Sequence, residues 1–359
     1  MTGNKGKSLR FEGISKHFGG IAALRTIDMD VSAGEFLTLL GPSGSGKTTL
    51  LNIAAGYLDP TTGRVFIGGE DVTRVAPRHR HIGMVFQSYA LFPHMTVRQN
   101  VGYGPTVRRL PKEEVRRRIE TTLAMVKMAD LAERSVEALS GGQRQRVALA
   151  RAMAAEPDVI LMDEPLGALD RQLRKEVQLE IRRLHEAHGR TTIYVTHDQE
   201  EALVMSDRIA VMRDGRIAQL GSASELYHRP RNTFIAGFLG ESNLIRGVVE
   251  ETADGQATLG VASLGMVFRA PAAEGLREGD TAALLIRPEN VRLCAEAPHG
   301  ITGQVEERIF LGEIEAVRLR LADGTEFWSR EFATERSERA GRLNASWNET
   351  AARILPIED

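Results

Sequence analysis

A glycine-rich run that ends in one lysine, Gly41-Pro-Ser-Gly-Ser-Gly46-Lys47-Thr48, has the residue types and spacing to bind a polyphosphate. It follows an apolar run and opens a helical stretch, a setting in which backbone N–H groups and a helix N-terminus face the same anion. With 35 glycines among 359 residues, chance predicts roughly 0.007 such matches. We expect Lys47 to neutralise the outer phosphates and the Thr48 hydroxyl to ligate Mg²⁺. The residues expected around the phosphates are Gly41, Pro42, Ser43, Gly44, Ser45, Gly46, Lys47, Thr48 and Thr49.

Two adjacent carboxylates, Asp163 and Glu164, end the apolar run of residues 159–162. Ligands of open α/β sheets bind where the parallel strands end, so we expect this pair beside the phosphate loop. Asp163 would hold a hydrated Mg²⁺, and Glu164 would polarise an attacking water as general base. The alternative, a strand that simply ends in solvated acids, is the weaker interpretation in a chain that also has a matching phosphate loop.

A second glycine pair, Gly141 and Gly142, stands between Ser140 and Gln143 at the start of another helical stretch. Ser140 as N-cap, with Gln143 three residues later, has the pattern of a capping box. Two adjacent glycines are unfavourable if they merely begin a helix, whereas they are explained if exposed amides at its positive end approach a second anion. Both interpretations can hold together.

The elements that must position these residues alternate between short apolar runs and helical stretches through the first two-thirds of the chain. This alternation predicts a parallel sheet covered on both faces. The expected parallel strands are residues 36–40, 82–86, 159–162, 191–196 and 208–212. Residues 9–18, 27–31 and 64–67 lack intervening helices and predict a small antiparallel addition.

A helical subdomain is expected at about residues 88–155. Within it, residues 112–128 place Val115, Ile119, Leu123 and Val126 on one helical face, and the arginines 116–118 are interpreted as a solvated face. After about residue 240 the helices nearly vanish, and strand-like runs between Gly, Pro and Asp-Gly turns predict a small β-barrel or sandwich.

Composition sets the limits on the class of protein. At roughly 150 residues per domain the length predicts about two domains, and 42% apolar with 26% charged residues is an ordinary globular mix. Residues 1–237 carry 33 Lys+Arg against 27 Asp+Glu, whereas residues 238–359 carry 13 against 21, so we place a domain boundary there. The formal net charge of −2 gives no overall electrostatic case for nucleic acid.

The compartment is also constrained by sequence. The single cysteine, Cys294, cannot form an internal disulfide, and residues 1–13 contain no apolar signal-peptide core, so the expected compartment is the cytosol. No run approaches the roughly 18 consecutive apolar residues of a spanning helix, and any membrane connection is expected to come through a partner.

Six motifs follow one another along the chain: the phosphate loop, Gln87 in MVFQ, LSGGQ, VILMDEP, Ala168-Leu169-Asp170 and His197. With these motifs in this order, residues 8–237 resemble the ATP-binding subunits of ABC transporters. The resemblance implies an α/β P-loop ATPase core, ATP and Mg²⁺ as cofactors, and a head-to-tail homodimer. In that dimer ATP lies between the phosphate loop of one subunit and the LSGGQ segment of the other. The implied partners are two integral-membrane permease subunits and, indirectly, an extracytoplasmic solute-binding protein, at the cytoplasmic face of the inner membrane.

The same resemblance implies roles for single residues. Phe18 matches the aromatic that stacks on adenine, although alone it would more often belong to a core. Gln87 matches the glutamine that senses Mg²⁺ and the attacking water, and it begins the loop that contacts the membrane subunits. His197 matches the histidine that contacts the γ-phosphate, and Asp170 the acid that links the two sites across the dimer. Gly167 departs from the serine usual in that loop, which leaves the rigidity of the loop open.

Residues 238–359 resemble the accessory oligonucleotide-binding-like β-domain of importer ATPases, on LLIRPENVRL (284–293) and ESNLIRGVV (241–249). Together with residues 82–101, this indicates the subgroup that serves polyamine and ferric-iron uptake, with polyamine preferred and ferric iron or another small solute as the alternative. A soluble ABC ATPase acting on nucleic acid is disfavoured by the single cassette and the acidic last third. A regulatory role of the β-domain stays open. Residues 242–245 and 287–289 are interpreted as surface and receive no ligand role.

Overall fold

The computed structural model describes residues 6–167, 169–294, 300–333 and 341–358. The chain divides into two compact units, Met1–Ala223 and Ser224–Asp359. Ala168, part of the expected Ala168-Leu169-Asp170 motif, lies outside the described residues. Within the described residues, no helix combines the length and the apolar composition that crossing a membrane requires.

A six-stranded sheet forms the centre of the first unit, in the order β10-β9-β3-β8-β7-β6. Its pairs β3–β8, β3–β9, β7–β8 and β6–β7 are parallel, and β10 adds an antiparallel edge. The five expected parallel strands are therefore confirmed. The bounds are β3 Phe36–Leu40, β6 Ile82–Val85, β7 Val159–Asp163, β8 Thr191–Thr196, β9 Arg208–Arg213 and β10 Arg216–Gly221.

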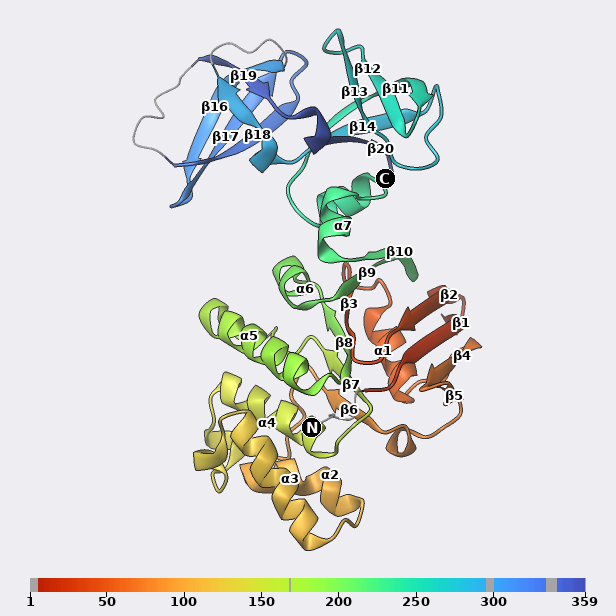
Figure 1. Cartoon of the computed structure of the whole chain (residues 1–359), viewed down its shortest axis with the longest axis vertical. Coiled ribbons are helices and arrows are strands. Elements are labelled where there is room, and N and C mark those ends of the chain that lie inside the picture. Colours follow the sequence, from red (N-terminus) through yellow and green to blue (C-terminus); the bar gives the residue numbers. More distant parts are fainter. Residues whose placement is uncertain (1–5, 168, 295–299, 334–340, 359) are drawn as a thin grey trace. The chain divides into compact units, whose positions relative to one another are not determined.

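The helices α1 (Lys47–Ala55) and α5 (Arg171–His188) cover opposite faces of this sheet, as Figure 1 shows. Successive strand residues alternate between two cores, because neighbouring side chains of a strand point to opposite faces. Leu161 of β7 packs in the core that contains α1, whereas Met162 packs in the core that contains Val177 and Ile181 of α5. Burial on both faces explains why these strands are continuously apolar in sequence.

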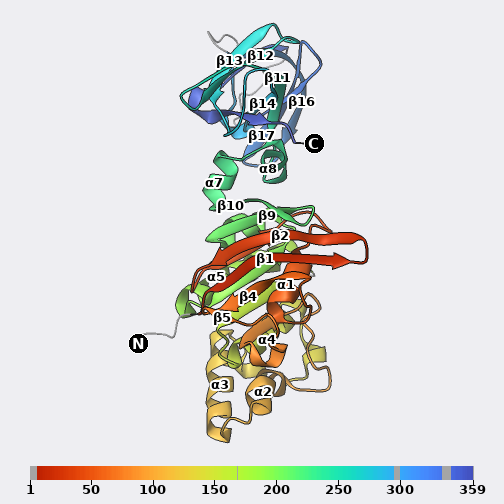
Figure 2. The same cartoon turned by 90° about the vertical axis from the view of Figure 1, so that its right-hand side faces the viewer.

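The expected antiparallel addition is a four-stranded sheet in the order β2-β1-β4-β5, seen in Figure 2. Its strands are β1 Leu9–Phe18, β2 Ile21–Val31, β4 Thr62–Ile67 and β5 Glu70–Asp71. Phe11, Ile27 and Val65 join the same core as α1, so this helix is packed between two sheets.

The helical part of the first unit contains α2 (Val97–Val107), α3 (Lys112–Met125) and α4 (Gly141–Ala154), and α6 (Gln199–Met205) follows β8. The apolar face expected on α3 is confirmed, since Ile119, Leu123 and Val126 are buried in one cluster. The interpretation of arginines 116–118 as a solvated face is correct only in part. The Arg118 side chain is 16% exposed and lies between the carboxylates of Glu114 and Glu156.

The second unit begins with the short helices α7 (Ala223–His228) and α8 (Thr233–Phe238), and its other described residues form strands joined by turns, as expected. Two five-stranded antiparallel sheets, in the orders β13-β12-β11-β14-β20 and β15-β19-β16-β17-β18, share one core. The first sheet contains β11 Asn243–Ala253, β12 Gln256–Val261, β13 Met266–Pro271, β14 Thr281–Ile286 and β20 Ala352–Pro356. The second contains β15 Arg292–Cys294, β16 Ile301–Phe310, β17 Ile314–Leu321, β18 Glu326–Phe332 and β19 Arg342–Ser346.

Short 3₁₀ turns complete the connections. They are η1 Pro77–His79, η2 Ala129–Leu131, η3 Val136–Ala138, η4 Pro288–Asn290 and η5 Glu349–Ala351.

Arg287 explains why the compact units divide earlier in the chain than the charge pattern predicts. This side chain is 2% exposed, and Asn243, Ile245 and Pro288 are buried as well, so the interpretation of residues 242–245 and 287–289 as surface is wrong for these four residues. Its guanidinium donates to the carbonyl oxygens of Ala236 (2.8 Å) and Tyr227 (3.1 Å) and to the Ser242 hydroxyl (2.6 Å). These bonds tie α7 and α8 to the β-domain, because several carbonyls together satisfy one buried cation.

Candidate functional site

The phosphate loop connects β3 to α1, in the strand–loop–helix context that its sequence predicts. Two of its glycines adopt conformations that other residues rarely accept, Gly44 at φ +80° and Gly46 at φ +101°. Gly41 has a packing reason instead, because a Cβ there would lie 2.3 Å from the Met212 carbonyl oxygen. Pro42, Ser43 and Gly44 are exposed, Ser45 is buried, and Thr49 lies in the first turn of α1.

The Lys47 ammonium is buried and folds back into its own loop. It donates to the carbonyl oxygens of Gly41 (2.7 Å) and Pro42 (2.9 Å), and lies 3.5 Å from the Ser45 hydroxyl. Burial lowers the pKa of Lys47, and the negative charges of Glu164 and Asp163 partly oppose this effect. A polyphosphate in the loop would supply the counter-charge that neutral carbonyls do not.

Thr48 and Asp163 form a pair of oxygen donors at the start of α1. The Thr48 hydroxyl donates to Asp163 Oδ1 over 3.1 Å. Burial raises the pKa of Asp163, and the nearby Glu164 charge adds to this, whereas the Thr48 hydrogen bond and Lys47 lower it. A hard cation would offset the burial of this carboxylate, so the donor set fits Mg²⁺. Among the described residues, no cluster of three or more His, Cys, Asp or Glu could hold a metal ion.

Glu164 lies at the centre of the next group of side chains. Its Oε2 accepts from Gln87 Nε2 (3.3 Å), and its Oε1 lies 3.1 Å from His197 Nδ1. The Glu164 backbone has φ +42°, although its N–H still pairs with the Val195 carbonyl at 3.0 Å. Such strained residues cluster at functional sites, where the surrounding structure fixes them.

The sheet topology explains why these distant residues meet. The phosphate loop follows β3, His197 follows β8, Asp163 ends β7 with Glu164 directly after it, and Gln87 follows β6. These four strands are neighbours in the sheet, and all four are parallel, so their carboxyl ends lie along one edge. The structure thus brings together six of the expected site residues: Lys47, Thr48, Gln87, Asp163, Glu164 and His197.

The expected capping box at α4 is present with both of its hydrogen bonds. Gln143 N–H donates to the Ser140 hydroxyl (3.3 Å), and Ser140 N–H donates to Gln143 Oε1 (3.0 Å). Ser140 and Gly141 are exposed. Gly142 is buried, and a Cβ there would lie 2.8 Å from Leu173 Cδ2, so this glycine has a packing role that the sequence interpretation missed.

Asp170 and Phe18 lie at the ends of other elements. Asp170 caps α5, since its Oδ1 accepts from Leu173 N–H at 3.0 Å. Phe18 ends β1 and is 50% exposed, with the Lys16 ammonium 5.1 Å from its ring centroid. Its ring is therefore available to a ligand and does not belong to a core. Among the described residues, no hydrogen bond joins Ser140, Asp170 or Phe18 to the Glu164 group.

A buried network behind His197 was not predicted from sequence. Glu201 is 3% exposed, and its Oε2 accepts from the hydroxyls of Tyr194 and Thr196, both at 2.7 Å. Burial raises the pKa of Glu201 despite these bonds. Arg174 bridges Asp198 Oδ2 and the Leu169 carbonyl, each at 3.1 Å, and so connects the loops that carry His197 and Asp170. No local pattern signals such a network, because its members come from three separate elements.

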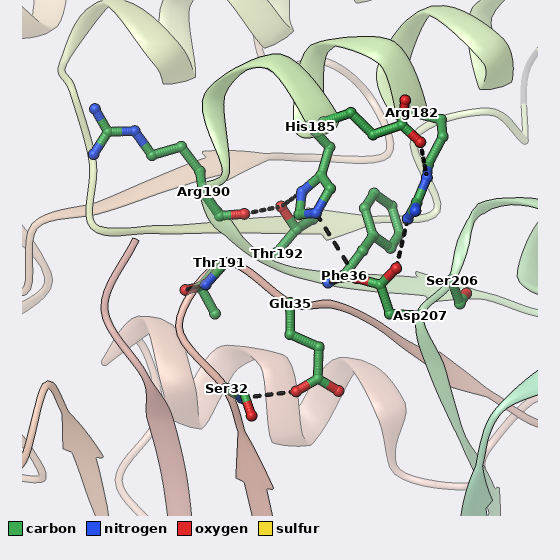
Figure 3. Close-up of polar contacts among 12 residues, drawn as sticks. Ser32, Glu35, Phe36, Arg182, His185, Arg190, Thr191, Thr192, Ser206 and Asp207 are labelled. Carbon is green, nitrogen blue, oxygen red and sulfur yellow. Dashed lines mark hydrogen bonds and ion pairs between the residues drawn. The ribbon is translucent and has the colours of Figure 1, made fainter. Parts of the chain in front are cut away.

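Figure 3 shows a second polar cluster, which includes the first residues of β3 and β8. His185 Nδ1 lies 3.3 Å from the Thr192 hydroxyl, and Asp207 accepts from Arg182 and from the Phe36 N–H, both at 2.9 Å. Burial lowers the pKa of His185. Since β3 and β8 begin here, the cluster fastens α5 to the sheet and is remote from the edge where ligands of such sheets bind.

Comparisons with known proteins give a family for each part of the chain. Residues 24–167 match the ABC transporter family, and residues 284–355 match the TOBE domain. The spermidine/putrescine import ATP-binding protein of Marinobacter nauticus is 44% identical, over 98% of this chain and 95% of that protein. The Fe(3+) ions import ATP-binding protein of Brucella abortus is 46% identical, over 87% of this chain and 88% of that protein.

Solved structures give the same result for the first unit. The dimeric structure of an ABC transporter cassette is 34% identical, with a TM-score of 0.54, and the match covers 60% of this chain and 98% of that one. The ADP conformation of another cassette is 30% identical, with a TM-score of 0.58 over 66% of this chain and 99% of that one. The fold, the arrangement around Glu164 and relatives of this identity and coverage together show that the chain is an ATPase and belongs to the ATP-binding proteins of ABC transporter import systems.

Proposed function

We propose that this ATPase drives the import of polyamines and that it hydrolyses Mg-ATP at the carboxyl ends of β3, β8, β7 and β6. The observation that carries the proposal is the position of Glu164, held between Gln87 and His197 beside the phosphate loop. This carboxylate is placed to accept a proton from a water whose oxygen bonds to the γ-phosphorus as the bond from that phosphorus to the ADP oxygen breaks, giving ADP and inorganic phosphate.

The other side chains bind and orient. Lys47 exchanges the carbonyls of its loop for phosphate oxygens, and His197, whose side chain is 60% exposed, is accessible to the γ-phosphate. Gln87 holds the Glu164 carboxylate in position toward the attacking water. When bound through Thr48 and Asp163, Mg²⁺ would neutralise charge on the phosphates. Catalysis then rests on positioning, since phosphoryl transfer needs little covalent chemistry from the protein.

A second copy of the chain completes the site in this proposal. Ser140, Gly141 and Gln143 are at least partly accessible at the start of α4, and Asp170 is exposed at the start of α5. Within one chain they make no hydrogen bond to the Glu164 group. A head-to-tail dimer would let the amides at α4 bind the phosphates of the partner's ATP, and the dimeric state of a similar cassette supports this arrangement.

The membrane partners in this proposal are two permease subunits, with an extracytoplasmic solute-binding protein acting through them. A groove of about 560 Å³ on α2 offers a docking surface, lined among others by His94, Arg98 and Tyr103. Tyr103 is 41% and Val107 62% exposed. Docking there would place the protein peripherally at the cytoplasmic face of the membrane. Polyamine is preferred because the first several relatives are spermidine/putrescine import proteins over most of the chain.

The catalytic roles are tested by two substitutions with opposite signatures. Glu164→Gln keeps the shape of the side chain but cannot accept a proton, so ATP binding should persist while kcat falls by about 100-fold or more. Lys47→Ala should weaken ATP binding itself. The exposed Glu120→Gln on α3 is the matched control and should change neither. An equal loss of affinity in the first two variants would contradict these roles.

The substrate is tested separately. The protein would be reconstituted in liposomes with permease subunits and a solute-binding protein that co-purify with it, and uptake of labelled spermidine and of ferric iron would be compared. ATP-dependent uptake of spermidine is expected. Uptake of iron without spermidine would overturn the polyamine assignment and leave the ATPase assignment intact.

A further inference from the structure

The loop that follows Gln87 is held in an unusual backbone conformation. Tyr89 has φ +62° and Ala90 has φ +46°, so two consecutive residues with side chains adopt the left-handed region that glycine favours. The Tyr89 side chain is 8% exposed, whereas Ala90 is exposed. A short loop in this conformation persists only where other contacts fix it.

Arg151 of α4 supplies those contacts. Its guanidinium donates from Nη1 to the Ala90 carbonyl at 2.7 Å and from Nη2 to the Tyr89 carbonyl at 2.9 Å. It also lies 5.7 Å from the ring centroid of Phe92. Burial lowers the pKa of Arg151, and within the part of the chain that the structure describes no Asp or Glu pairs with it. Both terminal nitrogens of the guanidinium group therefore hydrogen-bond to the two residues with positive φ.

We propose that Arg151 is a positioning residue for ATP hydrolysis: by gripping the carbonyls of Tyr89 and Ala90 it holds the strained loop, and thereby holds Gln87 against Glu164. The Gln87 Nε2 to Glu164 Oε2 distance of 3.3 Å is the contact that this grip maintains. Because Arg151 belongs to α4, the helix that Ser140 caps, the grip also couples the start of that helix to Gln87. The proposal rests on the proposed function, since it assigns Arg151 a part in the same reaction.

The first test removes the fork. Arg151→Met keeps an apolar stem of similar length and loses both carbonyl bonds, so we expect kcat to fall by about tenfold or more, with KM for Mg-ATP within about twofold of the native value. The phosphate loop is untouched, which is why KM should hold. The matched control is Arg146→Met on the same helix, which removes an arginine paired with Glu180 and should leave kcat nearly unchanged.

The second test relieves the strain instead. Glycine adopts positive φ without a steric penalty, so Ala90→Gly in the Arg151→Met background should recover kcat by about threefold or more. Ser88→Gly is the matched control, because it adds a glycine in the same exposed stretch at a residue without positive φ, and it should not recover activity. Should Arg151→Met fail to fold, Ala90→Val against Ser88→Val in the native background carries the test, and only Ala90→Val should lower kcat.

The outcomes separate the alternatives. A lower melting temperature with unchanged kcat in Arg151→Met would overturn the proposal, as would equal recovery by Gly at positions 88 and 90, or equal kcat in the two valine variants. The proposed function is judged independently, since it stands if native protein hydrolyses ATP and Glu164→Gln does not, whatever the Arg151 variants do.

Discussion

Ser140 gives the sharpest test of whether ATP is shared between two chains. In Ser140→Ala the Gln143 N–H loses its acceptor at 3.3 Å, while the reciprocal bond from Ser140 N–H to Gln143 Oε1 remains. Ser140 is exposed, so the free energy of unfolding should fall by about 0.5–1 kcal/mol, the lower part of the range for removing an N-cap. For a unit of 223 residues that corresponds to a fall in Tm of about 1–4 °C. Capping alone would leave ATP hydrolysis nearly unchanged.

The shared-site proposal predicts a catalytic effect that acts across chains. Ser140→Arg would place a bulky cation where the partner's ATP is proposed to bind, and Lys47→Ala would disable the chain's own phosphate loop. In a mixed head-to-tail dimer one site then carries both lesions and the other carries neither. Random pairing of equal amounts makes about half of the dimers mixed, so if the two sites act independently about a quarter of native activity should return.

The assay is steady-state phosphate release from each parent and from the mixture at the same total concentration. Strict coupling between the sites would hide the recovery, so ATP-dependent dimerisation is measured in parallel, by light scattering in a Glu164→Gln background that prolongs the closed state. Persistent monomers at saturating Mg-ATP with the permeases present, together with no gain in the mixture, would refute the shared site and leave Ser140 as a cap.

Three further predictions follow from contacts inside each unit. Gly142→Ala should change stability by less than about 1 kcal/mol, measured by denaturant unfolding, because the helix preference of alanine offsets the shift of the Leu173 side chain that the methyl group requires. A chain ending at Ala223 should fold and bind ATP. A chain ending after α8 keeps α7 and α8 but lacks the β-domain with Arg287, so the carbonyls that Arg287 binds lose their partner. This longer chain should aggregate more than the shorter one, as gel filtration would show. Burial lowers the pKa of His185 below 6.5, so the unfolded chain takes up a proton that the folded chain does not. Stability should therefore fall as pH drops through about 6.5, and His185→Gln, but not the exposed His17→Gln, should flatten this dependence.

The main sheet and the residues at its edge could be predicted because their signals are local. A parallel strand buried on both faces is apolar at every position, as residues 159–162 are, and a phosphate loop needs glycine and lysine at fixed spacing. Once the strands are parallel, topology alone brings Glu164 and His197 to one edge. The capping box at Ser140 is also a local pattern, and it formed as predicted.

The parts that could not be predicted depend on long side chains that reach the backbone of another element. Arg151 and Arg287 both bind carbonyl oxygens distant in sequence, and neither periodicity nor charge counting distinguishes them from solvated arginines. The positive φ of Tyr89 and Ala90 is likewise invisible, because a glycine is the sequence signal for that conformation and none is present.

Helix caps recur at or next to the residues proposed to act on ATP, and this affects how mutagenesis of the site should be designed. Ser140 caps α4, Asp170 caps α5, and Asp198, next to His197, caps α6. Alanine at any of them removes about 1 kcal/mol of helix stability besides its effect on chemistry, so an alanine scan would confound the two.

Replacements that keep the acceptor oxygen separate these effects. Asp170→Asn retains an oxygen that can accept the Leu173 N–H while removing the negative charge, and Ser140→Thr retains the hydroxyl while adding a methyl group. A loss of ATPase activity in variants that keep the cap, without a shift in melting temperature, can then be assigned to the nucleotide and not to an unwound first turn.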